Sequence, residues 1–314
     1  MYKRLSVALL ALLLCIPTSV FADSLGSVPS GSVVTIRVNR LGTDPGVSWL
    51  VETWHATPRD DSRLRNVLSP GIFTDVSVAV MPAAGAESLR LLMIATIAPG
   101  QTPSSSGLDS VIANSSSAIR TDTVAGISVR YNGSPTEGQD FAAYAVRGDT
   151  LYLASSRDVM RESLQAGSLS GLATFSDMSS RVDMAADGVL FATNEGGAFA
   201  DFLSPLEQKW QMSLLLSAQD LEWMASSFDV IDSERVIGRI LFMGSSSSAL
   251  PDITDDAEFL GEAFRRKFIG ENISYTSSVS TDGLLVALDF EVEGLESLWN
   301  RLFENGVFSI IRPE

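Results

Sequence analysis

The chain has 314 residues, of which 45% are hydrophobic and 19% are charged, and it carries a formal net charge of −16. This composition suits a folded globule and argues against an intrinsically disordered chain. The acidic balance disfavours nucleic acids and anionic membrane surfaces as partners, because both attract basic residues. The simplest role of the net charge itself is to keep the protein soluble.

The first 22 residues have the pattern of a secretory signal peptide. Lys3 and Arg4 form a positive start, an apolar run covers Leu5–Ile16, and small residues end at Ala22. We predict cleavage between Ala22 and Asp23, and hence an exported protein that is periplasmic or secreted. A membrane anchor is the alternative, but a spanning helix needs about 20 apolar residues and this run is shorter. No later stretch is long and apolar enough to span a bilayer, so we expect no transmembrane segment after removal of the signal.

Cysteine usage limits the chemistry of the mature chain. The only cysteine, Cys15, lies inside the predicted signal, so the mature chain would have no disulfide, no thiolate metal ligand and no cysteine nucleophile. Removal of Lys3 and Arg4 leaves 20 basic residues against 38 acidic ones, a net charge of −18. At about 290 residues, the mature chain can form one large domain or two smaller ones that are stabilised by a hydrophobic core alone.

Hydrophobic periodicity predicts strands and helices in a mixed order along the mature chain. In the first half we predict strands at 33–38, 75–81, 89–97, 126–132, 141–147 and 150–156, and helices at 48–56, 62–69, 104–119 and 157–167. In the second half we predict strands at 188–194, 220–230, 235–243, 273–280 and 284–292, and helices at 204–210, 255–268 and 294–306.

The two halves show the same order of elements. Asp75 and Asp220 each open a strand, Arg90 and Arg235 each open the next one, and both pairs are 145 residues apart. Self-similarity at this long period indicates a duplicated unit and not a solenoid. We therefore expect an α+β fold of two pseudo-repeated units, each an antiparallel sheet packed with helices, at 23–170 and 171–314 after a signal peptide at 1–22. Two unrelated α+β halves are the alternative.

The joint between the halves resembles a known family. The segment "LYLASSRDVMRESLQAG", followed by "LATFSDMSSRV" and "GVLFATN", is similar to the central part of a bacterial exported-protein family described as a domain of unknown function. The matching pattern between the two strands is Leu172, Phe175, Met178 and Arg181. The resemblance covers roughly 60 residues well and the rest by layout. It implies a bacterial extracytoplasmic α+β protein, and it carries over no catalytic residue.

The usual catalytic and metal-binding patterns are missing from the sequence. His55 is the only histidine, which disfavours a histidine-based triad and a zinc site of the usual kind. Lys209 and Lys267 lie on predicted helices among other charges, as solvated lysines do. There is no G-x-S-x-G elbow, no P-loop and no G-x-G-x-x-G motif. We therefore predict no catalytic residue, no cofactor and no metal.

The paired carboxylates have ordinary structural explanations. The acidic pairs at 60–61 and 255–256 precede predicted helices, where they would cap the first turn. Asp289 and Glu291 alternate with apolar residues along a strand and are expected to form its solvent face. The segment 251–259 lacks the spacing of a calcium loop. A glycosidase pair built from carboxylates far apart in sequence remains open.

Two tryptophans are candidate partner-binding residues. Trp223 lies in the strand 220–230, whose alternation places it with Leu221 and Ala225 on one face, and that face would mark a partner site if it were exposed. Trp299 lies with Leu295 on the apolar face of the last predicted helix, and such a face is more often core than binding groove.

The sequence therefore predicts an extracytoplasmic protein of the cell envelope. We expect a non-enzymatic binding or interaction module that holds an unknown protein or an apolar ligand in a cleft between its two halves, because ligands favour such clefts. An exported hydrolase that uses carboxylate or serine-based chemistry is the alternative.

Overall fold

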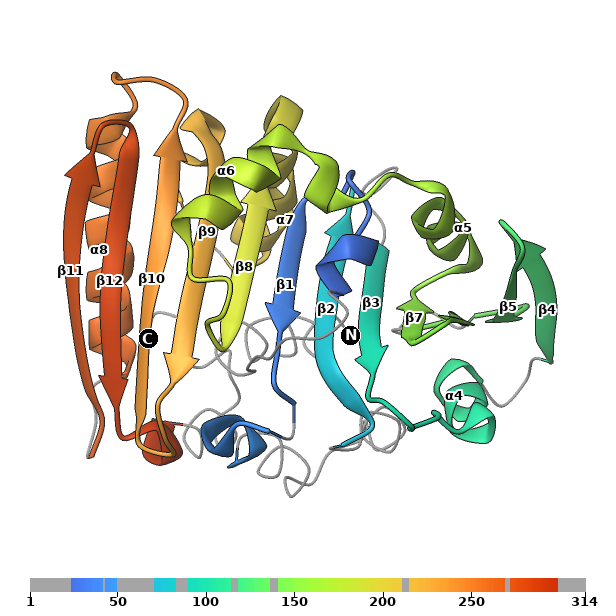
Figure 1. Cartoon of the computed structure of the whole chain (residues 1–314). Helices are drawn as coiled ribbons and strands as arrows, with labels where there is room; N and C mark the ends of the chain where they lie inside the picture. Colours follow the sequence, from blue (N-terminus) through green and yellow to red (C-terminus); the bar gives the residue numbers. More distant parts are fainter. Residues whose placement is uncertain are drawn as a thin grey trace.

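The centre of the protein is one antiparallel sheet. The computed structural model describes residues 24–41, 43–49, 71–82, 90–113, 118–135, 141–210, 215–268 and 272–298 (Figure 1). Twelve strands pair in the order β11-β12-β10-β9-β8-β1-β2-β3-β7-β6-β5-β4. Their bounds are β1 Val34–Val38, β2 Phe73–Met81, β3 Arg90–Ile97, β4 Ile119–Val124, β5 Ile127–Asn132, β6 Ala143–Arg147, β7 Thr150–Ala154, β8 Gly188–Thr193, β9 Leu221–Val230, β10 Arg235–Gly244, β11 Ser274–Asp282 and β12 Leu285–Glu293.

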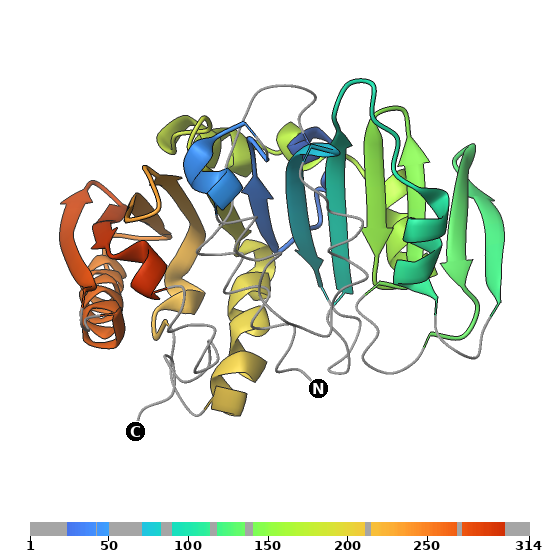
Figure 2. The ribbon, with the colours of Figure 1, turned by 90° about the horizontal axis from the view of Figure 1, so that it is seen from below.

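Helices cover parts of both faces of this sheet. The α-helices with both ends described are α4 Ser105–Ile112, α5 Arg157–Gln165, α6 Ala173–Arg181, α7 Ala198–Trp210 and α8 Leu250–Phe268, and residues 45–49 and 295–298 are also helical. Short 3-10 turns are η1 Ser24–Ser27, η2 Leu169–Gly171, η3 Glu195–Gly197 and η4 Ala218–Asp220. Buried residues of α5, α6 and η1 pack on one face, which we name the α6 face. Those of α4, α7 and α8 pack on the other, the α8 face, and Figure 2 shows α6 and α8 on opposite sides. None of the helices in the described part of the chain is long and apolar enough to cross a membrane.

The predicted α+β fold of two pseudo-repeated units, each with its own sheet, is wrong. β1 pairs antiparallel with β2 on one side and with β8 on the other, through Val34↔Val80 and Val34↔Ala192 at one end of the strand. The strands of both halves therefore belong to one sheet, which runs through the whole described structure and outweighs the helices. The order of elements along the chain does not reveal this pairing, because a strand buried on both faces reads the same whichever strand lies next to it.

Most of the predicted strands are confirmed, with small shifts at their ends. β4 was missed because its residues, "IRTDTV", are mostly polar and partly exposed. Two helices begin earlier than predicted: α7 starts at Ala198 and not at Ser204, and α8 starts at Leu250 and not at Asp255. In α7 the earlier turn is apolar and buries Phe199 against the α8 face, which outweighs the capping signal at Ser204. The helix predicted at 104–119 ends at Ile112, and Ile119 opens β4. The predicted helices at 48–56, 62–69 and 294–306 lie wholly or partly outside the described residues.

One close contact in the middle of the sheet depends on a glycine. Gly188 of β8 lies opposite Phe228 of β9, and a Cβ atom built on Gly188 would lie 2.2 Å from the Phe228 ring. The ring, which is buried, occupies the space that a side chain at position 188 would need. A larger residue at this position would displace a core side chain in a close-packed interior.

We expect Gly188→Ala to lower the free energy of unfolding by about 1–3 kcal/mol, because overpacking forces the Phe228 ring from its position. The measurement is urea unfolding followed by tryptophan fluorescence. Gly171→Ala is the control, since nothing lies within 4 Å of its Cβ position and the substitution has the same effect on the unfolded chain. Equal unfolding free energies for the two variants would contradict this packing.

Candidate functional site

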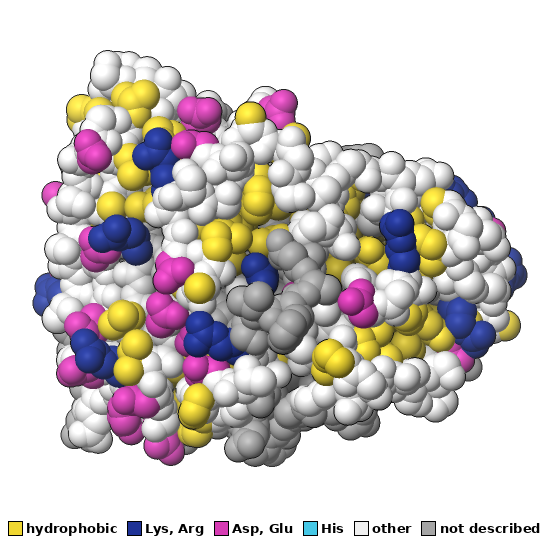
Figure 3. All heavy atoms as spheres, in the orientation of Figure 1, with side chains coloured by type: hydrophobic (Ala, Val, Ile, Leu, Met, Phe, Trp, Pro, Cys, Tyr) yellow, Lys and Arg dark blue, Asp and Glu magenta, His cyan; other side chains and the backbone are white. Residues whose placement is uncertain are grey.

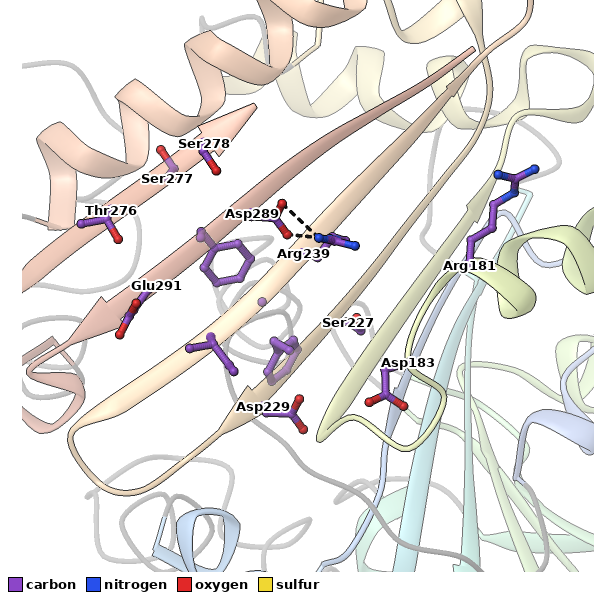
Figure 4. Close-up of a pocket in the computed structure, with 14 residues that line it drawn as sticks. Arg181, Asp183, Ser227, Asp229, Arg239, Thr276, Ser277, Ser278, Asp289 and Glu291 are labelled. Atoms are coloured by element: carbon purple, nitrogen blue, oxygen red, sulfur yellow. Dashed lines mark hydrogen bonds and ion pairs between the residues drawn. The ribbon is translucent and has the colours of Figure 1, made fainter. Parts of the chain in front are cut away.

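The α6 face is hollowed over the four strands at the C-terminal end of the sheet. The hollow has a volume of about 600 Å³, and β9, β10, β12 and β11 form its floor. Charged side chains gather on this part of the face, as Figure 3 shows on its left side. The lining residues are Arg181, Asp183, Ser227, Phe228, Asp229, Ile237, Gly238, Arg239, Thr276, Ser277, Ser278, Asp289, Phe290 and Glu291 (Figure 4).

An arginine–aspartate pair occupies the middle of the floor. Arg239 of β10 lies opposite Asp289 of β12, and its Nε and Nη2 atoms donate to the two carboxylate oxygens at 2.5 and 3.1 Å. This bidentate geometry is the strongest form of an arginine–carboxylate contact. Both side chains remain partly exposed, so the pair is accessible to a ligand while its charges are already matched.

The rest of the floor follows from strand alternation. Asp289 and Glu291 point to the α6 face, and Glu291 accepts a hydrogen bond at 2.5 Å from Nε of Arg235. The neighbouring edge strand, β11, places the hydroxyl groups of Thr276 and Ser278 next to these carboxylates. Because side chains two residues apart share a face, hydroxyl groups and carboxylates form two adjacent rows along the strands. The floor therefore offers many hydrogen-bonding groups.

One side of the hollow is formed by the end of α6 and the loop that follows it. Nε of Arg181 donates to Asp177 one helical turn earlier, at 2.9 Å. Asp183 lies near Asp229 of β9, as Figure 4 shows, and their like charges repel. The lining contains two arginines and four acidic residues, so the hollow is acidic overall.

A buried carboxylate lies next to this wall. The Asp187 side chain is 3% exposed, and its Oδ2 atom accepts a hydrogen bond at 2.6 Å from the backbone N–H of Val230. In return, the backbone N–H of Asp187 donates to Asp229 at 3.0 Å. Arg40, which follows β1, lies 3.9 Å from Asp187 and donates to the Ala185 carbonyl. These contacts join the loop after α6 to β9 and to the end of β1.

The environment raises the pKa of the carboxyl groups in this cluster. Burial raises the pKa of Asp187 to about 6, the negative charges of Asp44 and Asp229 add to this, and the Val230 N–H and Arg40 oppose it. Burial also raises the pKa of Asp229. Loss of solvent disfavours the ionised form, and one nearby arginine does not compensate for several carboxylates.

Of the two sequence-predicted partner-binding residues, only Trp223 lies within the described part of the chain. Trp223 is 1% exposed and belongs to the core, where its indole N–H donates to Asp177 at 3.2 Å, so its strand face is not exposed. Trp299, His55 and the predicted cleavage site at Ala22 and Asp23 lie outside the described residues. Asp289 and Glu291 lie on a solvent face, as their alternation predicts, and that face is the floor of the hollow.

Sequence reasoning missed the residues that complete the floor. Arg239 shares its face of β10 with Ile237 and Leu241, which are two residues away on either side, and Thr276 shares its face of β11 with Ser278. Alternation shows that these side chains share a face, but it does not show that β10, β12 and β11 are neighbours. The pairing of the strands was the missing information.

The hollow does not have the composition of a metal centre or of a nucleophilic active site. Its lining includes no histidine, cysteine or lysine. In the part of the chain that the structure describes, no three His, Cys, Asp or Glu side chains are grouped so that they could hold a metal ion. The carboxylates Asp289 and Glu291 accept from arginines and not from serine hydroxyls. The arrangement is suited to binding by charge and hydrogen bonds.

Comparisons with known protein families, with curated proteins and with solved structures found no match.

We expect Asp187→Asn to raise the melting temperature at pH 7.5, with a gain that shrinks toward zero at pH 4. The folded protein holds a proton on Asp187 up to about pH 6, whereas the unfolded chain releases it near the ordinary value of 3.8. The contribution of this carboxyl to stability is therefore present below pH 3.8 and lost as the pH rises through 6. At pH 7.5 the ionised group destabilises the fold, and asparagine removes the charge while its carbonyl oxygen can still accept from Val230.

The matched control is Asp232→Asn. Asp232 is exposed, and like Asp187 it accepts a hydrogen bond from a backbone N–H, here that of Glu234. Differential scanning calorimetry of both variants and the wild type at the two pH values makes the comparison. A gain for Asp187→Asn that is the same at both pH values would show that the charge of this group is not the cause.

Proposed function

We propose that this protein is a non-enzymatic binding or interaction module of the bacterial cell envelope, and that the acidic hollow over β9–β12 is its binding site. The observation that carries the proposal is the chemistry of the lining: four carboxylates, two arginines and a row of hydroxyl groups on a rigid antiparallel floor. A site built on strands holds its polar groups in fixed positions, which favours selective recognition.

The lining also indicates the class of ligand. Two of the four carboxylates accept hydrogen bonds from arginines, whereas the negative charges of Asp183 and Asp44 act on Asp229 and only the charge of Arg40 opposes them (Figure 4). A ligand that carries an amine or guanidinium group would relieve the repulsion between like charges. Its hydroxyl or amide groups would meet Thr276 and Ser278. We therefore favour a basic segment of a partner protein over the apolar ligand expected from the sequence.

The site of binding differs from the one expected between the two halves. The lining residues all lie between positions 181 and 291, whereas β1 and β8 close the junction of the halves by direct pairing. Export of the chain is part of the proposal and is supported by the residue pattern of 1–22, which lies outside the described residues.

A carboxylate-based hydrolase is the second candidate. It is favoured by one observation, the raised pKa of Asp229 in the wall of the hollow, since a general acid needs such a shift. The bidentate contact of Asp289 with Arg239 argues against it, because this carboxylate has its oxygen atoms already engaged. A binding role needs no catalytic group in addition to the side chains that line the hollow.

We expect a lysine-rich peptide to bind the wild-type protein and to bind the variant Thr276→Lys about tenfold more weakly. The new lysine would lie opposite Glu291 on the floor, where it would add a positive charge that repels the peptide and would fill part of the hollow. Isothermal titration calorimetry at low and high salt measures the affinity, which should fall as salt rises. A glutamate-rich peptide should not bind.

Thr281→Lys is the matched control, because it adds the same charge to the same strand on the opposite face. Equal affinities for the two lysine variants would show that peptide binding reflects the net charge of the protein and not the hollow. Capture from envelope extract with the same pair of variants then identifies a natural partner. If neither peptide binds and no partner is captured, the proposed function is wrong.

A further inference from the structure

The strand at one end of the sheet has an open side. β11 is the first strand in the sheet order, paired only with β12 among the described strands, and Figure 1 shows it at the end of the sheet. All nine of its residues pair with β12 in a regular register without a bulge. Seven of the nine are exposed, including residues on both faces of the strand. In the part of the chain that the structure describes, no strand pairs with the outer edge of β11, so its second row of backbone N–H and C=O groups is open to a partner strand.

β11 lacks the features that protect edge strands from pairing. Natural edges carry lysines, prolines or bulges, or they are short, so that they do not join another sheet. The sequence "SYTSSVSTD" has no lysine, arginine, proline or glycine, and its single charge, Asp282, is the last residue. In a chain with a net charge of −16, eight consecutive uncharged residues on an exposed edge are a local exception to the charge of the molecule.

We propose that β11 pairs antiparallel with β11 of a second copy of this chain, about a twofold axis near Ser278, and so joins two sheets edge to edge. This interface uses the outward backbone groups of β11, whereas the side chains of Thr276 and Ser278 on the same strand line the hollow, so the two proposals are tested by different measurements. It is isologous, and closed twofold dimers are the most common soluble oligomers. The open backbone groups of both strands are satisfied at once, as in other proteins that bind by strand addition.

Side-chain chemistry favours a second copy as the occupant. In a register centred on Ser278, Thr276 lies opposite Ser280 of the partner and Asp282 lies opposite Ser274, so no like charges face each other. Cross-strand pairs of hydroxyl residues are favourable in antiparallel sheets. The acidic row of β12 in one copy would lie three strand spacings, about 14 Å, from that of the other, beyond the Debye length of about 8 Å at physiological salt.

The other edge of the sheet is a less suitable partner. β4 has six residues, against nine in β11, and carries the charged residues Arg120 and Asp122. Asp122 is bound by Arg157 of α5, which fixes this edge to its own chain. Pairing of β11 with β4 of another copy would also be head to tail and would produce an open filament instead of a closed dimer.

The first test is the mass of the protein in solution. We expect the apparent mass from sedimentation equilibrium to rise toward twice the chain mass as the chain concentration increases from about 1 to about 100 μM, the range in which weak protein pairs associate. Ser278→Lys should weaken association about tenfold or more, because it places two like charges directly opposite each other. Ser247→Lys, which adds the same charge to an exposed loop, should leave association unchanged.

The second test locates the contact. Ser278→Cys should form a disulfide-linked dimer on mild oxidation, because residues on the axis face one another at a distance that a disulfide can bridge. The wild-type protein under the same oxidation accounts for any contribution of Cys15. A double variant with Ser278→Cys and Thr123→Cys distinguishes the head-to-tail arrangement, in which position 278 would link to position 123 in long chains of crosslinked copies.

A single chain mass at all concentrations would overturn the proposal, as would equal association of the two lysine variants or crosslinking from position 278 to position 123. Because peptide binding in the hollow is measured separately, with Thr281→Lys as its control, failure of the dimer leaves the proposed function standing. Failure of peptide binding would likewise leave the proposed dimer standing.

Discussion

The pairing of β1 with β8 is the interaction on which the rest of the structure depends. β1 is hydrogen-bonded along its whole length to β2 on one side and to β8 on the other, and all five of its residues are buried. Without this strand the sheet would separate into two parts, each with a long unprotected edge. Because the junction is closed by main-chain hydrogen bonds, a binding site has to lie on a face of the sheet or at its ends, and the hollow lies on a face.

The same register explains why the α6 face contains a row of polar side chains. The row crosses the sheet through the successive cross-strand neighbours Asp289, Arg239, Ser227, Val189, Arg37 and Ser77, of which only Val189 is apolar. Near the centre η1 covers it: Ser24 is 1% exposed, and its Oγ atom lies 2.6 Å from Oγ of Ser77.

The covered part of this row and its open part differ in electrostatics. Asp75, which is fully buried next to the row, accepts a hydrogen bond from the Ser24 backbone N–H, and its burial raises its pKa although the Arg37 charge opposes this. Over β9–β12 no helix in the described part of the chain covers the row, and the same kinds of side chain line the hollow. Where η1 covers the row, its polar residues make buried hydrogen bonds within the chain. Where no helix covers it, they are available to bind a ligand.

The sequence predicted local structure better than it predicted neighbours. Alternation and β-branched residues located β1, β2, β3 and β8–β12, because the period of a strand depends only on which faces are buried. It also placed Asp289 and Glu291 on a solvent face. It did not predict that β1 joins β8, because this contact links residues 150 or more positions apart and each strand reads as apolar with any neighbour. The candidate site was missed for the same reason, since its residues are brought together only by the pairing of β9, β10, β12 and β11.

Trp223 shows the limit of residue type as a guide to function. A tryptophan on an alternating strand has the same sequence signature whether a partner or a helix of its own chain covers it. Here α6 covers it, because Phe175 and Met178 on one face of that helix pack into the core beside β8, with the rings of Phe175 and Phe191 4.9 Å apart. Phe175 and Met178 of α6 therefore have a packing role.

The length of α6 determines where the core ends and the hollow begins. The rows of the sheet beneath the helix are apolar: Trp223 and Met243 form one, and Ala225 and Leu241 form the next. One row further along, Ser227 and Arg239 replace them, and this change coincides with the end of α6 at Arg181. A helix that covered the Arg239–Asp289 pair would desolvate both charges, and this cost would oppose folding. The change from apolar to charged rows along β9 and β10 and the end of the helix are therefore two consequences of one requirement, that charged pairs remain in contact with water.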